Sequence, residues 1–418
     1  MFSKPIADDG IPPNLIQTLK SFPFAVHALL FFTLVVRFSY FMAWPFIAVI
    51  MTKNYHLSPI TIGLAMTCSA LISVVLGMVG GQVSDRLGRR VILLLGCGCS
   101  AVGYSLLAEA AGVGLFMTGL LIIGVSFAWV DAPLRALMSD LLVDRRRRAL
   151  ALQLRYYLVN VAAVGGPLVG IAFGLNSQKG TFLITGLSYI PFFIYVLFFI
   201  PKGNLLHARA EQPMENLKLP QIIGIIAKDQ IYLAALACSI LCSIVFIHYE
   251  AILPQYLLSL DGHAAIRLIT LILVVNATTV LVFQTFLMRF MTNFSLPKRI
   301  MIGGLMFALS QMAFFTVRSL DISLWLLATT LFSIGEAILM PNLNILLDQL
   351  APPAHRGAYL GASMLSTLGI AIGPLIGGVL LALTGAGVFI STTLLSLLLC
   401  LVIHLCRKSL NKRLLESA

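Results

Sequence analysis

The chain has 418 residues, of which 59% are hydrophobic and only 11% are charged. A soluble protein of this length needs a polar surface that these residues cannot supply, so the composition indicates an integral membrane protein. The formal net charge of +12 can suit nucleic acid, but orientation of the chain in a bilayer explains it better.

Apolar stretches of about 20 residues recur along the whole chain, which is the length that a helix needs to cross a hydrocarbon core of about 30 Å. No alternation of apolar and polar residues runs through them, so a β-barrel is not expected. The fold class predicted is an all-α membrane protein with twelve transmembrane helices in two pseudo-symmetric six-helix bundles. The expected spans are residues 24–51, 58–83, 90–109, 112–139, 149–174, 180–200, 231–259, 264–290, 298–318, 321–349, 356–384 and 386–406.

The longest polar break, residues 201–230, divides the spans into two sets of six. We therefore expect an N-terminal bundle over residues 24–200 and a C-terminal bundle over residues 231–406. Residues 1–23 and 407–418 are expected to be tails. Most of the 28 lysine and arginine residues fall in segments that share one side of the membrane if the N-terminus is inside. This bias places both tails and the central loop in the cytoplasm, with the chain in the cell's inner membrane.

A compact charged motif, GGQVSDRLGRRVI at residues 80–92, follows the second expected span. Glycine permits a tight turn and close helix approach, and an acid at a helix end can pair with arginine. The spacing resembles the signature of the major facilitator superfamily. That resemblance implies a cytoplasmic gate that holds the two bundles together in the outward-open state, although a cluster that only sets topology is the alternative. The residues assigned to the gate are Gly81, Asp85, Arg86, Gly88, Arg89, Arg90, Asp140 and Arg148.

The two halves of the chain repeat one another. Residues 131–170 resemble residues 339–378: Pro133 matches Pro341, and Gly166-Pro167 matches Gly373-Pro374. A duplicated six-span unit indicates two bundles related by an axis along the membrane normal, with the substrate bound between them.

Six charged residues fall inside the expected spans, where charge is costly and usually functional. Glu336 is the first choice as proton carrier, because a carboxyl held away from water can bind and release a proton near neutral pH. Its segment also resembles the tenth span of some multidrug exporters, where an acid couples protons. The alternative is a permanent pair with Arg37. Asp131 is the second proton-site candidate, or it simply neutralises Arg135 four residues later.

The other charges are assigned to the transport cavity: Arg37, Glu250, Arg135 and Arg155. Arg37 either tunes an acid or binds an anionic substrate. Glu250 recruits a cationic substrate, relays a proton, or only faces water. Polar and aromatic residues in the spans are candidates for the cavity wall, although tyrosine and tryptophan are also normal at membrane interfaces. These candidates are Tyr40, Trp44, Trp129, Tyr156, Asn160, Tyr249, Asn276 and Asn342.

A second motif, GIAIGPLIGG at residues 369–378, resembles the antiporter signature of drug:proton exporters. That family carries it on the fifth span, where this chain retains Gly166, Pro167 and Gly170; the later copy contains Gly373 and Pro374. Proline and glycine here are expected to kink the helix and admit a neighbour. Ordinary packing of small residues is the alternative.

These features together identify the chain as similar to the drug:proton antiporter branch of the major facilitator superfamily. The resemblance implies a monomeric exporter that moves drug-like or amphipathic small molecules against protons by alternating access. Carriers of siderophores, metabolites, peptides, sugars or lysolipids, by export or by proton symport, are the alternatives. An enzyme is disfavoured because the chain has neither clustered metal ligands nor a Gly-x4-Gly-Lys-Ser loop. No cofactor, metal, catalytic residue or nucleic-acid partner is expected; the partners are substrate, protons and lipid.

Overall fold

The computed structural model describes residues 19–142, 144–174, 178–201, 219–260, 264–291, 293–317, 321–352, 359 and 362–416. Over these residues the chain is helical, with no strand. Most of the predicted N-terminal tail and central loop lies outside this part of the chain.

The N-terminal helices follow the expected spans closely. They are α2 (Phe24–Lys53), α3 (Pro59–Leu87), α4 (Arg89–Glu109), α5 (Val113–Asp140), α6 (Arg145–Gly174) and α7 (Gln178–Phe199). The start of α3 is capped by Ser58, whose hydroxyl accepts a hydrogen bond from the Thr61 backbone N–H at 3.2 Å. The helix ends at Gly88, whose φ of +93° is readily adopted only by glycine, so the chain turns at once into α4.

The C-terminal helices include two segments that are not α-helical, the π-helical η2 and the 3₁₀-helical η4. The helices are α8 (Leu219–Lys228), α9 (Gln230–Ile247), η2 (His248–Ile252), α10 (Leu253–Leu260), α11 (Ala264–Met291), α12 (Leu296–Thr316), α13 (Ile322–Leu350), η4 (Met364–Thr367), α15 (Leu368–Thr384) and α16 (Gly387–Glu416). A π-helical turn, η2, breaks the seventh span, since the Leu253 N–H donates to the His248 carbonyl five residues back. Pro254 follows and has no N–H to continue the regular ladder.

Two boundaries differ from the sequence expectation. The end of the predicted central loop is helical as α8, and α16 continues through most of the predicted C-terminal tail. In the described part of the chain, 11 helical stretches are long and apolar enough to cross a membrane. The expected fifth span is α6, a 30-residue helix that packs along α2.

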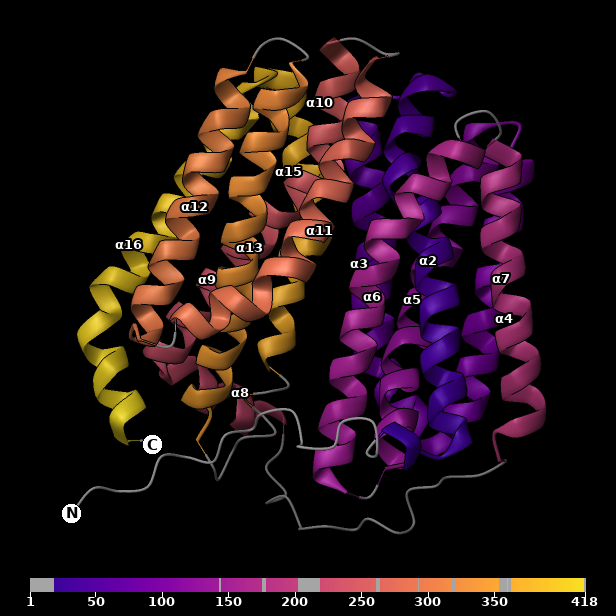
Figure 1. Ribbon diagram of the computed structural model, residues 1–418, viewed down its shortest axis with the longest axis horizontal. Helices are drawn as coiled ribbons and strands as arrows, with labels where there is room; N and C mark the ends of the chain where they lie inside the picture. Colours follow the sequence, from indigo (N-terminus) through magenta and orange to yellow (C-terminus); the bar gives the residue numbers. More distant parts are fainter. Residues whose placement is uncertain are drawn as a thin grey trace.

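The helices form two groups that lie side by side (Figure 1). One group contains α2 to α7 and the other α9 to α16. They meet where α3 contacts α15, α6 contacts α11, and α2 contacts α10. In Figure 1 the groups converge at the end away from the last turn of α16 and diverge toward that turn. The chain is therefore an all-α membrane protein whose two helix groups are joined mainly at one end.

Candidate functional site

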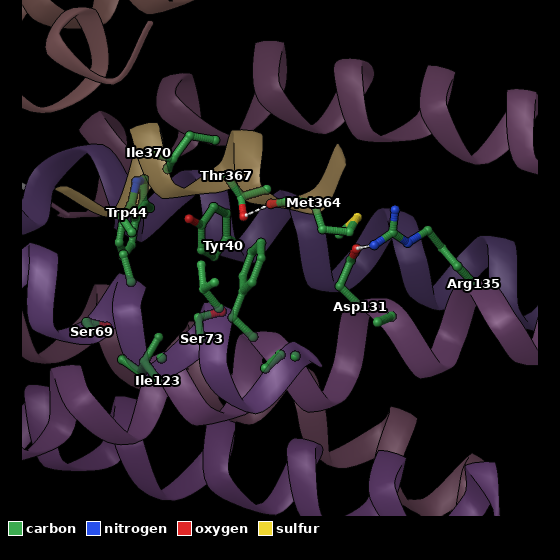
Figure 2. A pocket seen from close by; sticks show the side chains of 18 residues that line it. Tyr40, Trp44, Ser69, Ser73, Ile123, Asp131, Arg135, Met364, Thr367 and Ile370 are labelled. Atoms are coloured by element: carbon green, nitrogen blue, oxygen red, sulfur yellow. Dashed lines mark hydrogen bonds and ion pairs between the residues drawn. The ribbon is translucent and has the colours of Figure 1, made fainter. Parts of the chain in front are cut away.

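A cavity of about 570 Å³ lies between the two helix groups, a size that suits a small organic molecule. Helices α2, α3 and α5 supply one wall, and η4 with α15 supplies the other. Figure 2 shows Asp131 and Arg135 together at one end of the cavity and Trp44 with Ile123 at the other. The Tyr40 and Trp44 rings stack with their centroids 5.4 Å apart. The cavity thus has a charged end and an aromatic end.

Three arginines surround the carboxylate of Asp131. Its Oδ1 accepts hydrogen bonds from Arg37 on α2 and Arg155 on α6, and its Oδ2 pairs with Arg135 at 3.1 Å. The pairing with Arg135 was one of the alternatives that the sequence offered for Asp131, whereas the other two partners become neighbours only when α2, α5 and α6 pack. One carboxylate among three guanidinium groups has a formal net charge of +2. This four-residue set is called the arginine cluster below.

The arginines of the cluster differ in exposure. The side chains of Arg37 and Arg155 are 14% and 12% exposed, whereas that of Arg135 is 48% exposed. Arg37 also lies over the Phe127 ring, with its guanidinium carbon 4.8 Å from the ring centroid. Arg37 and Arg155 therefore bind Asp131 on its buried side, and Arg135 is the arginine of the cluster that lines the cavity.

Glu336 lies in the middle of α13, in the opposite helix group. Its Oε2 accepts a hydrogen bond of 2.7 Å from the side-chain amide of Asn276 on α11, which also donates to the Ser333 hydroxyl at 3.1 Å. The alternative in which Arg37 pairs with Glu336 is wrong, because Arg37 pairs with Asp131. Among the described residues, the hydrogen-bond partner of Glu336 is the uncharged amide of Asn276.

Glu250 lies in the π-helical turn η2, which packs against α2. Its carboxyl is close enough to Glu336 and to Tyr40 for an electrostatic interaction with each. Within the described ranges no hydrogen bond or ion pair reaches this carboxyl. Glu336 and Glu250 therefore both belong to the helix group opposite the one that contains the arginine cluster.

The predicted gate residues that the structure describes hold one helix group together. Arg89 donates to the Asp140 carboxylate at 3.2 Å and to the Ser84 hydroxyl at 3.1 Å, tying the ends of α3, α4 and α5. Arg90 donates to the Leu197 carbonyl, and Arg148 donates to the Leu142 carbonyl rather than joining the carboxylate. Gly81 lies within α3, and the side chains of Asp85 and Arg86 lie outside what the structure describes.

Sequence comparison decides the family. A profile described as Major Facilitator Superfamily matches residues 29–366 and 251–416. The chain belongs to the Major Facilitator Superfamily. It is 29% identical to the MFS-type transporter YqjV of Bacillus subtilis (strain 168), covering 85% of this chain and 86% of that protein. It is 25% identical to the multidrug resistance protein MdtH of Cronobacter sakazakii (strain ATCC BAA-894), covering 84% and 83%.

Solved structures agree on the fold. A crystal structure of a mutant peptide transporter POT in complex with alafosfalin superposes with a TM-score of 0.75 at 16% identity, covering 94% of this chain and 96% of that one. The relatives named in these comparisons are transporters, so this member of the Major Facilitator Superfamily is a transporter of small molecules and not an enzyme.

Some of the predicted cavity residues of this transporter line the cavity, and the others do not. Tyr40 and Trp44 line the cavity. Tyr156 donates to the Gln284 side chain at 2.8 Å across the two groups, and Asn160 donates to the Tyr156 carbonyl. The remaining candidates are not among the residues that line the cavity. The backbone of Trp129 lies against Gly96, Tyr249 donates to the Ile272 carbonyl, Asn342 donates to the Ile338 carbonyl, and Asn276 donates to Glu336.

The two copies of the glycine–proline motif lie in different parts of the fold. Gly166 and Gly170 of α6, which flank Pro167, let that helix touch the backbone of α2. In α15, Gly373 packs on Ile247 of α9, while the carbonyl of Pro374 reaches Gly63 of α3 in the other helix group. The α15 copy therefore lies at the junction of the groups. The sequence analysis did not predict the contacts of Gly63 and Thr67 with α15. In the sequence these residues are only a glycine and a hydroxyl side chain in an apolar helix.

Proposed function

We propose that this transporter is a proton-coupled exporter, which moves amphipathic small molecules out of the cell in exchange for protons. The cavity between the helix groups supports this proposal, as does its mix of one charged and one aromatic end. MdtH, a relative, is named as a multidrug resistance protein. Another relative, from Planococcus maritimus, is named as a Na⁺, Li⁺, K⁺/H⁺ antiporter. We place both termini in the cytoplasm and the chain in the inner membrane, from the lysine and arginine bias.

The observation that carries the proposal is the environment of Glu336. Its carboxyl is bonded by the neutral amide of Asn276, so it can gain or lose a proton without breaking an ion pair. Asp131 is the weaker of the two proton-site candidates, because its protonation would leave Arg37, Arg135 and Arg155 without a counter-charge. We therefore assign the proton to Glu336, with Glu250 as the nearest second acid.

The proposed cycle alternates the opening between the two sides of the membrane. A proton from outside neutralises Glu336 and the substrate leaves; the groups then rock, the proton passes to the cytoplasm, and a new substrate binds. A membrane potential that is negative inside assists proton entry by about 2.3 kcal/mol per charge per 100 mV. The helix groups are the rocking units, and the contacts of α3 with α15 close one side.

Transport in vesicles tests the assignment. A compound that thermally stabilises the purified chain is chosen as substrate, since a ligand of the folded state raises its apparent stability. A pH gradient should drive wild-type transport uphill, and Glu336→Gln should abolish that driven transport while retaining substrate-for-substrate exchange. The control is Glu109→Gln, which removes an exposed carboxylate paired with Lys179. Gradient-driven transport by Glu336→Gln at the wild-type rate would refute the proton role.

A further inference from the structure

The charge that the cavity offers to a ligand is positive. Both oxygens of Asp131 are already paired: Oδ1 accepts hydrogen bonds from Arg37 and Arg155, and Oδ2 forms an ion pair with Arg135. A cationic ligand would have to displace one of these guanidinium groups. By contrast, Arg135 uses its guanidinium only for Asp131 among the residues that the structure describes, and nearly half of its side chain is exposed. Its remaining N–H groups are available to an acceptor.

The rest of the cavity wall suits an apolar body. Asp131 and Arg135 are the two charged residues among those that line it. The wall beyond them contains the stacked Tyr40 and Trp44 rings, Ile123 and Met364. Figure 2 shows Met364 and Tyr40 lying between the charged end and Trp44, so a ligand with its charge at Arg135 would extend along apolar side chains.

We propose that the cavity binds an organic anion with a single carboxylate and an aromatic or apolar body, and that Arg135 donates to that carboxylate. Guanidinium and carboxylate groups match in a two-bond geometry, which lysine cannot reproduce. The net charge of the arginine cluster attracts the anion, and the Tyr40–Trp44 stack contacts its body. The inference rests on the proposed use of this cavity for substrate, but not on the direction in which protons move.

The charge preference of the cavity is tested with three probes that share the same aromatic ring system and differ in charge. Naphthoate, naphthamide and naphthylmethylammonium are titrated calorimetrically into the purified full-length chain in detergent. Naphthoate should bind at least roughly tenfold more tightly than the other two, as expected for a hydrogen bond to a charged group. Arg135→Gln should lower naphthoate affinity by about tenfold or more and leave naphthamide affinity unchanged, and Arg135→Lys should lie between.

Matched variants keep the test decisive. Arg407→Gln removes an exposed arginine on α16, far along the chain from the cavity wall, and should bind naphthoate as the wild type does. Retained naphthamide binding shows that Arg135→Gln is folded. Tighter binding of naphthylmethylammonium than of naphthoate, no binding of naphthoate, or an unchanged probe ranking in Arg135→Gln would overturn the proposal. Because binding is measured without a pH gradient, gradient-driven transport that survives in Glu336→Gln vesicles would refute the proposed proton role without changing the binding result.

Discussion

Gly63 of α3 lies against the carbonyl oxygen of Pro374 in α15, so closely that a Cβ atom on Gly63 would stand 2.3 Å from that oxygen. The same contact is repeated nearby, where a Cβ atom on Gly378 would stand 2.3 Å from the Pro59 carbonyl oxygen. One turn beyond Gly63 along α3, the Thr67 hydroxyl accepts a hydrogen bond from the Leu375 N–H at 3.1 Å. The two helix groups thus touch backbone to backbone, as small residues allow in membranes.

Replacement of Gly63 should open this contact. In Gly63→Ala the new methyl group meets backbone atoms, which cannot rotate aside, so α3 and α15 must separate. Spin labels at Ile60 and Leu383, two exposed positions on these helices, should therefore report a longer distance in Gly63→Ala than in the parent, in a cysteine-free background. Transport should fall because the closed side no longer seals.

The control for this prediction is Gly98→Ala. Gly98 lies in α4, and a Cβ atom there would meet nothing within 4 Å. This variant should keep both the label distance and the transport rate. An unchanged label distance in Gly63→Ala would mean that the backbone contact does not hold the groups together.

Removal of the Asp131 charge should destabilise the fold. Asp131→Asn leaves Arg37, Arg135 and Arg155 close together with no counter-charge, and breaking a buried ion pair from one side costs about 3 to 5 kcal/mol. The thermal midpoint in detergent should fall clearly. Asp131→Glu retains the charge and should lose less. If the Asn and Glu variants melt together with the wild type, the cluster does not stabilise the bundle.

Sequence reasoning predicted the helices better than the site. Apolar length placed α2 to α5 and α11 to α13 within a few residues, because a membrane demands long continuous helices. The pair Asp131–Arg135 followed from a spacing of one helical turn. Arg37 lies 94 residues from Asp131, and no local pattern indicates that they bond. Likewise the contact of Gly63 with Pro374 joins helices that are distant in the sequence, which periodicity does not encode.

Gly88 should not tolerate a side chain. Its φ of +93° and ψ of 144° lie where residues with a Cβ atom are strained by about 1 to 3 kcal/mol. Gly88→Ala should therefore lower the thermal midpoint and disturb the adjacent Arg89–Asp140 pair. Gly114→Ala is the matched control, since that glycine is helical and has open space around it, so its midpoint should stay level or rise. Equal midpoints for the two variants would exclude strain at Gly88.

The ion pair of Arg413 with Asp229 joins the ends of three helices in the C-terminal group. Arg413 of α16 bonds both carboxylate oxygens of Asp229, at 2.6 and 2.7 Å, and also donates to the Leu350 carbonyl at the end of α13. Asp229 caps α9 by accepting from the Tyr232 N–H at 3.0 Å, and it accepts from the Tyr359 hydroxyl at 2.9 Å. This site lies just before the α9 span and ties down the helical extension of α16.

These bonds make the stability of the fold depend on pH in the acid range. Burial acts to raise the pKa of Asp229, but the hydrogen bonds from Arg413, the Tyr232 N–H and Tyr359 outweigh it and hold the pKa below its ordinary value. The unfolded chain therefore binds this proton at a higher pH than the folded chain. The resulting stabilisation is present above about pH 4, the ordinary aspartate value, and is lost as pH falls through the lower folded value.

Arg413→Gln should weaken this acid dependence, because the Tyr232 N–H and the Tyr359 hydroxyl still donate to Asp229. Its thermal midpoint should fall relative to the wild type at pH 6, and the gap between the two proteins should narrow as the pH is lowered from about 4 toward 3. The measurement is a melting series in detergent across that range. Arg407→Gln, which changes an exposed arginine of the same helix, should track the wild type at every pH. A gap between Arg413→Gln and the wild type that stays constant or widens in acid would show that the bonds to Asp229 do not lower its pKa in the folded chain.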